Sequence, residues 1–253
     1  MRFLITNDDG ILAPGIDRLV EAAEPLGVVT VVAPDREQSG MSHSLTLHQP
    51  VRPIQRGERR WQINGTPTDC VMIALEALMP ERPDFVLSGI NHGHNMGEDV
   101  LYSGTVAAAM EGLALGIPSI AFSFAGGDLR ADLGYLKDQV KVVTRVLKHL
   151  VELPEFPVNT LFNVNLPPLP ADEVKGVRLT RLGRRVYSNS LQKMEDPWGR
   201  RVFWIGGGEI TWSGEESSDF HAIREGYVSV TPLHLDLTNF DVLGTSERWW
   251  RPL

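Results

Sequence analysis

Short apolar runs alternate with segments of helical periodicity through about the first 165 residues, and this alternation limits the possible folds more than any other feature. The run 28–33 is apolar except at Thr30, which is typical of a strand covered on both faces. Strands joined by helices form right-handed crossovers and are therefore parallel. The pattern predicts an α/β fold, a three-layer, doubly wound, Rossmann-like and mostly parallel sheet. The expected strands are residues 3–6, 28–33, 61–64, 84–90, 118–124 and 161–166.

Helices are expected between these strands wherever a start signal precedes apolar residues at helical spacing. Thr66 has the character of an N-cap, with Pro67 at the first helical position and Asp69 in the first turn. The expected helices begin at Pro14, Pro67 and Ser103, and one long amphipathic helix runs from Leu133 to Leu150.

The pattern changes at Val177, where helical periodicity gives way to short apolar runs separated by turn residues. The residues of a type I turn, 196–199, divide the run 186–194 from the run 200–205, which predicts a long β-hairpin. We therefore divide the chain into a Rossmann-like catalytic core (1–176), a β-rich hairpin arm for oligomerisation (177–225) and a C-terminal segment (226–253) that returns to the core or to a partner subunit.

Tryptophan is concentrated toward the end of the chain, because five of the six tryptophans lie at or beyond Trp198. A thin hairpin cannot bury so much aromatic surface on itself, which favours a partner subunit that covers the arm. The alternative is that these rings pack back onto the chain's own core.

Composition excludes several classes of protein. A single cysteine, Cys70, rules out an intrachain disulfide and a multi-cysteine metal site. The 24 basic and 32 acidic residues give a net charge of −8, which disfavours a nonspecific nucleic-acid binder. No apolar run is long enough to span a membrane and the apolar N-terminal stretch is too short for a signal peptide, so we expect a cytoplasmic protein without a membrane partner.

Two adjacent carboxylates, Asp8 and Asp9, follow the first expected strand. Ligands of open α/β sheets bind at the carboxyl ends of strands, and paired carboxylates repel unless a cation lies between them. Oxygen ligands favour Mg²⁺ or Mn²⁺ over Zn²⁺. The alternative is that both residues only shape a turn or cap the next helix.

Polar loops also follow the second strand and the strand 84–90. Ser39, beside Gly40, offers a neutral oxygen ligand, although a serine and glycine loop often holds no ligand. Asn91 can give its amide oxygen to a metal, and Asn95 can donate its NH₂ to an anion. His92 and His94 are weaker candidates, because a spacing of two on a loop does not define a metal pair.

The helix that begins near Ser103 starts with Ser103, Gly104 and Thr105, whose hydroxyls and free N–H groups can hold a phosphate. An ordinary serine N-cap is the alternative. Four polar loops at one sheet edge, with a metal-holding pair and a phosphate cradle, indicate phosphoryl chemistry.

Six motifs occur in order along the chain: Asn7-Asp8-Asp9-Gly10, Ala33-Pro34-Asp35-Arg36 with Ser39-Gly40 and Ser44-Leu45-Thr46, Gly65-Thr66-Pro67-Thr68-Asp69-Cys70, Ser88-Gly89-Ile90-Asn91 with Gly93, Asn95 and Gly97, Tyr102 to Glu111, and Thr231-Pro232-Leu233 with Asp236-Leu237-Thr238. In these motifs the chain resembles the SurE family, and the resemblance runs from residue 1 to about 125 and weakly again near the end.

This resemblance implies a 5'-nucleotidase, a phosphatase that depends on one divalent metal ion and acts on nucleoside 5'- and 3'-monophosphates, with some members trimming short polyphosphate. It implies a metal held by Asp8, Asp9, Ser39 and Asn91. It places the phosphate against Asn95, Ser103, Gly104 and Thr105. It also implies dimers or tetramers built with a C-terminal arm.

We expect Asp8, Asp9 and Asn95 to be catalytic, with a metal-activated water attacking phosphorus and Asp9 orienting or deprotonating that water. Direct attack by Asp8 to give an aspartyl-phosphate stays open. The rival functions are a non-catalytic nucleotide-binding module, an oligomer scaffold, and a broad-specificity phosphatase or exopolyphosphatase on the same fold.

Overall fold

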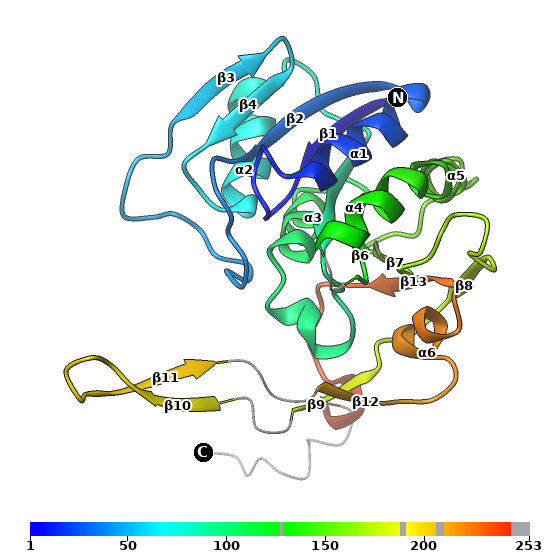
Figure 1. Cartoon of the computed structure of the whole chain (residues 1–253). Helices are drawn as coiled ribbons and strands as arrows, with labels where there is room; N and C mark the ends of the chain where they lie inside the picture. The colour runs from blue at the N-terminus through cyan, green and yellow to red at the C-terminus, as the bar shows by residue number, and fades with distance from the viewer. Residues whose placement is uncertain (127–128, 188–190, 206–209, 244–253) are drawn as a thin grey trace, which may run out of the picture.

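The computed structural model describes residues 1–126, 129–187, 191–205 and 210–243, and within them one twisted sheet carries helices on both faces (Figure 1). Its strand order is β3-β4-β2-β1-β5-β6-β7-β13-β8. These strands are β1 (Arg2–Thr6), β2 (Val28–Pro34), β3 (Pro53–Gly57), β4 (Arg60–Ile63), β5 (Phe85–His92), β6 (Ser119–Phe124), β7 (Leu161–Leu166), β8 (Val177–Leu179) and β13 (Val228–Leu233).

The six central strands are parallel, and the antiparallel pairings lie toward the edges, between β3 and β4 and between β7 and β13. The chain runs from β1 outward to β2 and β4, then returns to the other side of β1 to form β5, β6 and β7. The strand order therefore reverses between β1 and β5, where open α/β sheets bind their ligands. This mostly parallel α/β architecture confirms the predicted fold class.

Two helical layers cover the sheet. On one face α1 packs against α4 and α5, and on the other α2 packs against α3. The separate apolar clusters that contain Leu19 and Val71 show that each layer buries its own face of the sheet. The longer helical segments are α1 (Pro14–Ala23), α2 (Pro67–Ile73, continued by η2, Ala74–Leu78), α3 (Gly104–Ala114), α4 (Leu129–Asp138) and α5 (Val140–Val151), with single turns η1 (Glu24–Leu26) and η3 (Gly97–Leu101).

Local sequence signals explain where two of these helices lie. The Thr66 hydroxyl accepts the Asp69 N–H, and the Asp69 carboxylate accepts the Thr66 N–H, so the predicted start of α2 is a complete capping box. In α1, a side chain at Gly15 would place its Cβ only 1.9 Å from the Ile90 carbonyl oxygen, so only glycine lets α1 lie directly on the end of β5.

The expected single helix 133–150 is wrong, because the chain forms α4 and α5 with Gln139 between them. The Gln139 side chain is fully buried, and its Nε2 donates to the carbonyl oxygens of Pro167 and Leu169, both at 2.6 Å. This polar contact with the segment after β7 holds the junction, and periodicity alone does not show it.

The segment after Val177 contains more than a hairpin. β8 pairs with β13 in the main sheet, which thus extends three residues past the boundary we placed at residue 176. Helices α6 (Asp219–Arg224) and α7 (Phe240–Leu243) also lie where we expected no helix, because such short helices show no periodicity. β13 returns to the core beside β7.

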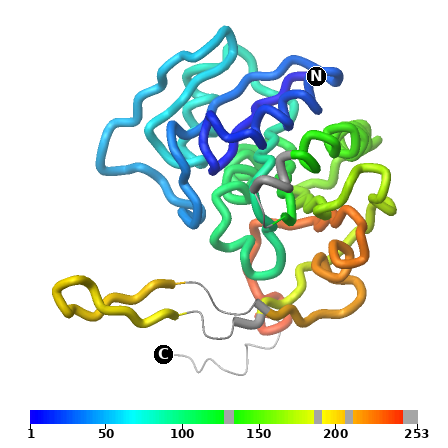
Figure 2. The backbone as a smooth tube through the Cα atoms, in the orientation of Figure 1, coloured from blue at the N-terminus to red at the C-terminus, as the bar shows by residue number. Residues whose placement is uncertain are grey.

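The arm is a hairpin that projects from the body, as Figure 2 shows in yellow. At its root β9 (Arg184–Tyr187) pairs with β12 (Ile210–Ser213), and farther out β10 (Leu191–Glu195) pairs with β11 (Arg201–Ile205). The Gly199 N–H bonds to the Asp196 carbonyl at 2.9 Å, which confirms the predicted turn.

The tryptophans 249 and 250 lie outside the described residues. None of the helices in the described ranges is long and apolar enough to cross a bilayer.

Candidate active site

The loop that carries Asp8 and Asp9 is fixed at the carboxyl end of β1. The Asn7 side-chain amide donates to the Gly10 carbonyl at 2.9 Å, and Ile11 N–H bonds to the carbonyl of Pro34, the last residue of β2, at 2.8 Å. Gly10 has a φ of +97°, a conformation that glycine adopts without strain. The two carboxylates are therefore presented at the point where the strand order reverses.

Asp8 and Asn91 are brought together by a third side chain. The Thr105 hydroxyl donates to Asp8 Oδ1 and lies 3.3 Å from Asn91 Oδ1. Asn91 comes from β5 and Thr105 from the first turn of α3, so β1, β5 and α3 meet here. A Cβ on Gly104 would lie 2.8 Å from Asp8 Cβ, so glycine at this position allows the close approach.

Burial raises the pKa of Asp8, although hydrogen bonding to the Thr105 hydroxyl and to the backbone of Thr105 and Gly104 opposes the rise. Burial and the neighbouring charge of Asp8 raise the pKa of Asp9 to about 6. Two neighbouring carboxylates whose charged forms are disfavoured in this way are stabilised when a cation binds between them.

The other two proposed metal ligands, Asn91 and Ser39, line the same cleft as Asp8. Asp9 Oδ2 accepts the His92 N–H at 3.1 Å, and Asn91 Nδ2 donates to the Gly93 carbonyl at 2.9 Å, which directs the Asn91 oxygen toward Thr105. Ser39 lies on the exposed loop after β2 and donates to Glu37 Oε1 at 2.7 Å.

This donor set fits a hard divalent cation. It offers two carboxylates, an amide oxygen and a hydroxyl, the ligand types that suit Mg²⁺ and Mn²⁺. Within the part of the chain that the structure describes, no group of three or more histidine, cysteine, aspartate or glutamate side chains is placed to bind a metal.

Ser103 caps the start of α3. The Ser103 hydroxyl accepts the Val106 N–H at 3.0 Å, so Ser103 is the N-cap of α3. The Thr105 side chain is fully buried and its hydroxyl is bonded to Asp8, so that hydroxyl supports a proposed metal ligand. Phosphate binding by Ser103, Gly104 and Thr105 stays a prediction.

Asn95 is held by the interior of the sheet. Its carbonyl accepts both the Asn163 and the Asn165 side-chain amides, at 2.8 and 3.0 Å. Its N–H bonds to Asn165 Oδ1 at 2.9 Å and its Nδ2 donates to Ser123 Oγ at 2.8 Å. Sequence reasoning missed Ser123, Asn163 and Asn165, although two asparagines inside an apolar strand are a detectable signal.

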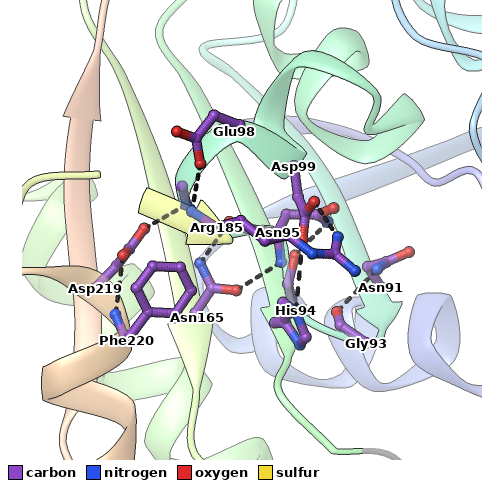
Figure 3. Close-up of polar contacts among 12 residues, drawn as sticks. Asn91, Gly93, His94, Asn95, Glu98, Asp99, Asn165, Arg185, Asp219 and Phe220 are labelled. Atoms are coloured by element: carbon purple, nitrogen blue, oxygen red, sulfur yellow. Dashed lines mark hydrogen bonds and ion pairs between the residues drawn. The ribbon is translucent and has the colours of Figure 1, made fainter. Parts of the chain in front are cut away.

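A charged cluster on the other side of Asn95 was also missed (Figure 3). Arg185, from β9 at the root of the arm, forms an ion pair with Asp99 Oδ1, and His94 Nε2 lies 3.5 Å from Asp99 Oδ2. Burial raises the pKa of Asp99, but the bonds from His94 and Arg185 outweigh it and hold that pKa below its ordinary value. Arg185 N–H also donates to Glu98 Oε2 at 2.6 Å.

A cleft of about 460 Å³ joins most of these groups. The predicted site residues that line it are Asp8, Ser39, Asn91, Asn95 and Ser103, and the previously missed Asp99 and Arg185 line it too. Asp9, Gly104 and Thr105 are not among its lining residues. His92 and His94 line the cleft, whereas His43 bonds to Glu111 at 2.8 Å outside it.

The family model for "Survival protein SurE" matches residues 3–189. The chain belongs to the SurE family. It is 67% identical to the 5'-nucleotidase SurE of Gemmatimonas aurantiaca over 99% of both chains, and 45% identical to that of Pelobacter propionicus over 98% of this chain and 99% of the relative. The crystal structure of the SurE protein from Aquifex aeolicus superposes with a TM-score of 0.85 at 43% identity, over 98% of this chain and 99% of that one. Membership of the SurE family confirms the resemblance that the motifs carry.

Proposed function

We propose that this SurE-family chain is a 5'-nucleotidase that hydrolyses nucleoside 5'-monophosphates, and 3'-monophosphates as well, to nucleoside and phosphate with one Mg²⁺ or Mn²⁺ ion. The observation that carries the proposal is the convergence of Asp8 and Asn91 on Thr105 beside the start of α3. Relatives that match almost the whole chain at 45–67% identity are named 5'-nucleotidases, which supports the same activity.

In this proposal Asp8, Asp9, Ser39 and Asn91 hold the ion. When bound, the ion supplies a water of lowered pKa and neutralises the charge that develops on the phosphate. Thr105 fixes the Asp8 carboxylate through its hydroxyl, and the His92 N–H fixes that of Asp9. The Gln38 N–H bonds to the Asp8 carbonyl at 2.7 Å, which ties the Ser39 loop to the same centre.

The chain's own groups then position the phosphate. Ser103 and Asn95 line the cleft and offer polar atoms to phosphate oxygens, and the α3 N-terminus favours a negative charge. Asp9 orients the attacking water and accepts its proton. Asn163 and Asn165 fix the backbone of Asn95 at the edge of this cleft.

The proposal includes a homodimer or homotetramer formed through the arm. The side chains of β10 and β11 are all exposed in the single chain, including Trp204 at 69% and Ile205 at 85%. An isolated two-stranded hairpin is marginally stable in water. A second copy of this chain, which offers the same apolar surface, is the partner that covers it.

The deciding experiment measures phosphate release from nucleoside 5'- and 3'-monophosphates with Mn²⁺, with Mg²⁺ and with EDTA. We expect release with either metal, none with EDTA, and none above background from Asp8→Asn. Asp172→Asn, an exposed carboxylate that does not line the cleft, is the matched control and keeps wild-type turnover. Nucleotide binding without phosphate release under either metal would instead indicate a non-catalytic module. Equal rates of phosphate release from all phosphomonoesters would indicate a general phosphatase.

A further inference from the structure

A second hollow of about 360 Å³ adjoins the phosphate-side cleft. His94 lines both the cleft and the hollow. Ala125 lines the hollow, and its neighbour Gly126 lines the cleft. Other lining residues are Met96, Trp212, Ser213, Phe220 and His221. The cavity lies between the loop after β5, the root of the arm and α6, and the proposed reaction leaves it unused.

The wall of this hollow is aromatic. The Trp212 ring meets the His94 ring edge to face, with centroids 5.2 Å apart and planes at 74°, and it packs on Phe220 with centroids 3.5 Å apart. The Arg185 guanidinium, which lines the first cleft, lies 5.5 Å from the Trp212 ring centroid. The partition between the cavities is therefore formed by His94, Arg185 and Trp212.

A buried carboxylate fixes this wall. Asp219 is fully buried and accepts the N–H groups of Gly97, Gly183 and Phe220, each at 2.9 Å. Figure 3 shows its contact with Phe220. A Cβ on Gly183 would lie 2.3 Å from the Phe220 ring, so the backbone of the arm's root lies flush against that ring. The hollow is thus formed before any ligand arrives, as ligand pockets usually are.

We infer that this hollow holds the nucleobase of the substrate, with Trp212 as its stacking platform, while the phosphate lies in the adjoining cleft. The inference rests on the proposed function and names the part of the site that distinguishes a nucleotide from other phosphomonoesters. An aromatic face stacks on any base. The Ser213 hydroxyl and the His221 ring provide polar groups at the edge, and His221 Nδ1 is held 3.1 Å from an Arg224 Nη2.

The test compares steady-state kinetics of Trp212→Leu and Trp212→Phe on three substrates, adenosine 5'-monophosphate, ribose 5-phosphate and p-nitrophenyl phosphate. We expect Trp212→Leu to raise KM for the nucleotide roughly 10-fold or more, the scale of one lost stacking contact, and to leave the sugar phosphate within about 2-fold of wild type. Trp212→Phe keeps an aromatic face and keeps most of the nucleotide preference. Trp198→Leu, at the 78% exposed tip of the arm, is the matched control and changes neither.

A proportional change on all three substrates, or no change on any, overturns the inference. Ribose 5-phosphate turnover and the midpoint of thermal unfolding report whether each variant is folded. If Trp212→Leu does not fold, His221→Ala at the pocket edge tests the inference instead. We expect it to raise KM for the nucleotide selectively, and an equal rise in KM for all three substrates would contradict the inference. Wild-type protein that releases no phosphate from any substrate would refute the proposed function itself. That result differs from the variant results that would overturn only the nucleobase inference.

Discussion

At the scale of single residues, Asp99 connects segments that are far apart in the sequence. Its side chain is only 12% exposed, and it bonds to Arg185 from the arm and to His94 from the loop after β5. These partners hold the pKa of Asp99 below its ordinary value against the effect of burial. The ionised carboxylate therefore stabilises the folded chain, and the same ion pair forms one side of the proposed substrate cleft.

Replacing this carboxylate by an amide gives a pH-dependent effect with a definite sign. Because the folded pKa lies below the unfolded value near 3.8, the stabilisation is present above pH 3.8 and is lost as the pH falls through the folded pKa. We expect Asp99→Asn to lower the free energy of unfolding by about 1–3 kcal/mol from pH 7 down to the unfolded pKa near 3.8, and by progressively less as the pH falls below that value. Urea denaturation of both proteins across this range measures the difference.

The same titration with Asp172→Asn, an exposed carboxylate, provides the baseline. A difference between Asp99→Asn and wild type that does not shrink as the pH falls below 3.8 would show that the ionised carboxylate does not carry the stabilisation.

At the scale of elements, the start of α3 approaches the loop after β1 so closely that one methyl group decides the fit. A Cβ at Gly104 would lie 2.8 Å from Asp8 Cβ and 3.2 Å from Pro67 Cγ, so Gly104→Ala must move α3 or Asp8. Overpacking of this kind costs about 1–3 kcal/mol. We expect metal-dependent phosphate release to fall at least about 10-fold, as measured in the assay described above.

Gly134→Ala is the matched substitution, because a Cβ at Gly134 meets open space on α4. Alanine there raises helix propensity, so we expect up to about 1 kcal/mol of added stability and unchanged turnover. Equal activity in the two variants would contradict the close approach of α3 to Asp8.

Local signals in the sequence predicted the elements that place the proposed site. Apolar runs in the sequence predict the strands that lead to Asp8 and Asn91. Capping residues predict the helix starts at Thr66 and at Ser103. The break at Gln139 and the short helix α6 could not be predicted in this way, because each depends on contacts with distant segments or is too short to show a period.

The same distinction applies to the site. Motif residues at or just beyond the ends of strands, such as Asp8, Asn91 and Asn95, could be selected from the sequence because strand ends converge at one sheet edge. Arg185 and Trp212 could not, because only tertiary structure brings the root of the arm to the loop after β5. Asn163 and Asn165 lie between these cases, since their polarity in an apolar strand was visible but their partner, the Asn95 carbonyl, was not.

At the scale of the whole molecule, the arm presents an apolar surface that the chain's own core leaves uncovered. In β11, Phe203 and Trp204 are 57% and 69% exposed. We expect the wild-type protein to be a dimer or tetramer by light scattering and the Phe203→Ser, Trp204→Ser double variant to dissociate toward the monomer. The unfolding midpoint of the core, measured for both proteins at low concentration, stays the same.

Val158→Ser removes an apolar side chain of similar exposure, 78%, from the loop before β7 and keeps the wild-type assembly. A wild-type protein that is monomeric at micromolar concentration, or a double variant with unchanged mass, would contradict assembly through the arm.

Asp219 is synthesised after all the proposed metal ligands, although it anchors a loop beside them. All four proposed metal ligands lie within the first 91 residues, whereas the carboxylate that holds Gly97 and Gly183 in place comes at position 219. A nascent chain, or a product of premature termination, can therefore carry every proposed ligand while the loop after β5 and the root of the arm lack their common anchor.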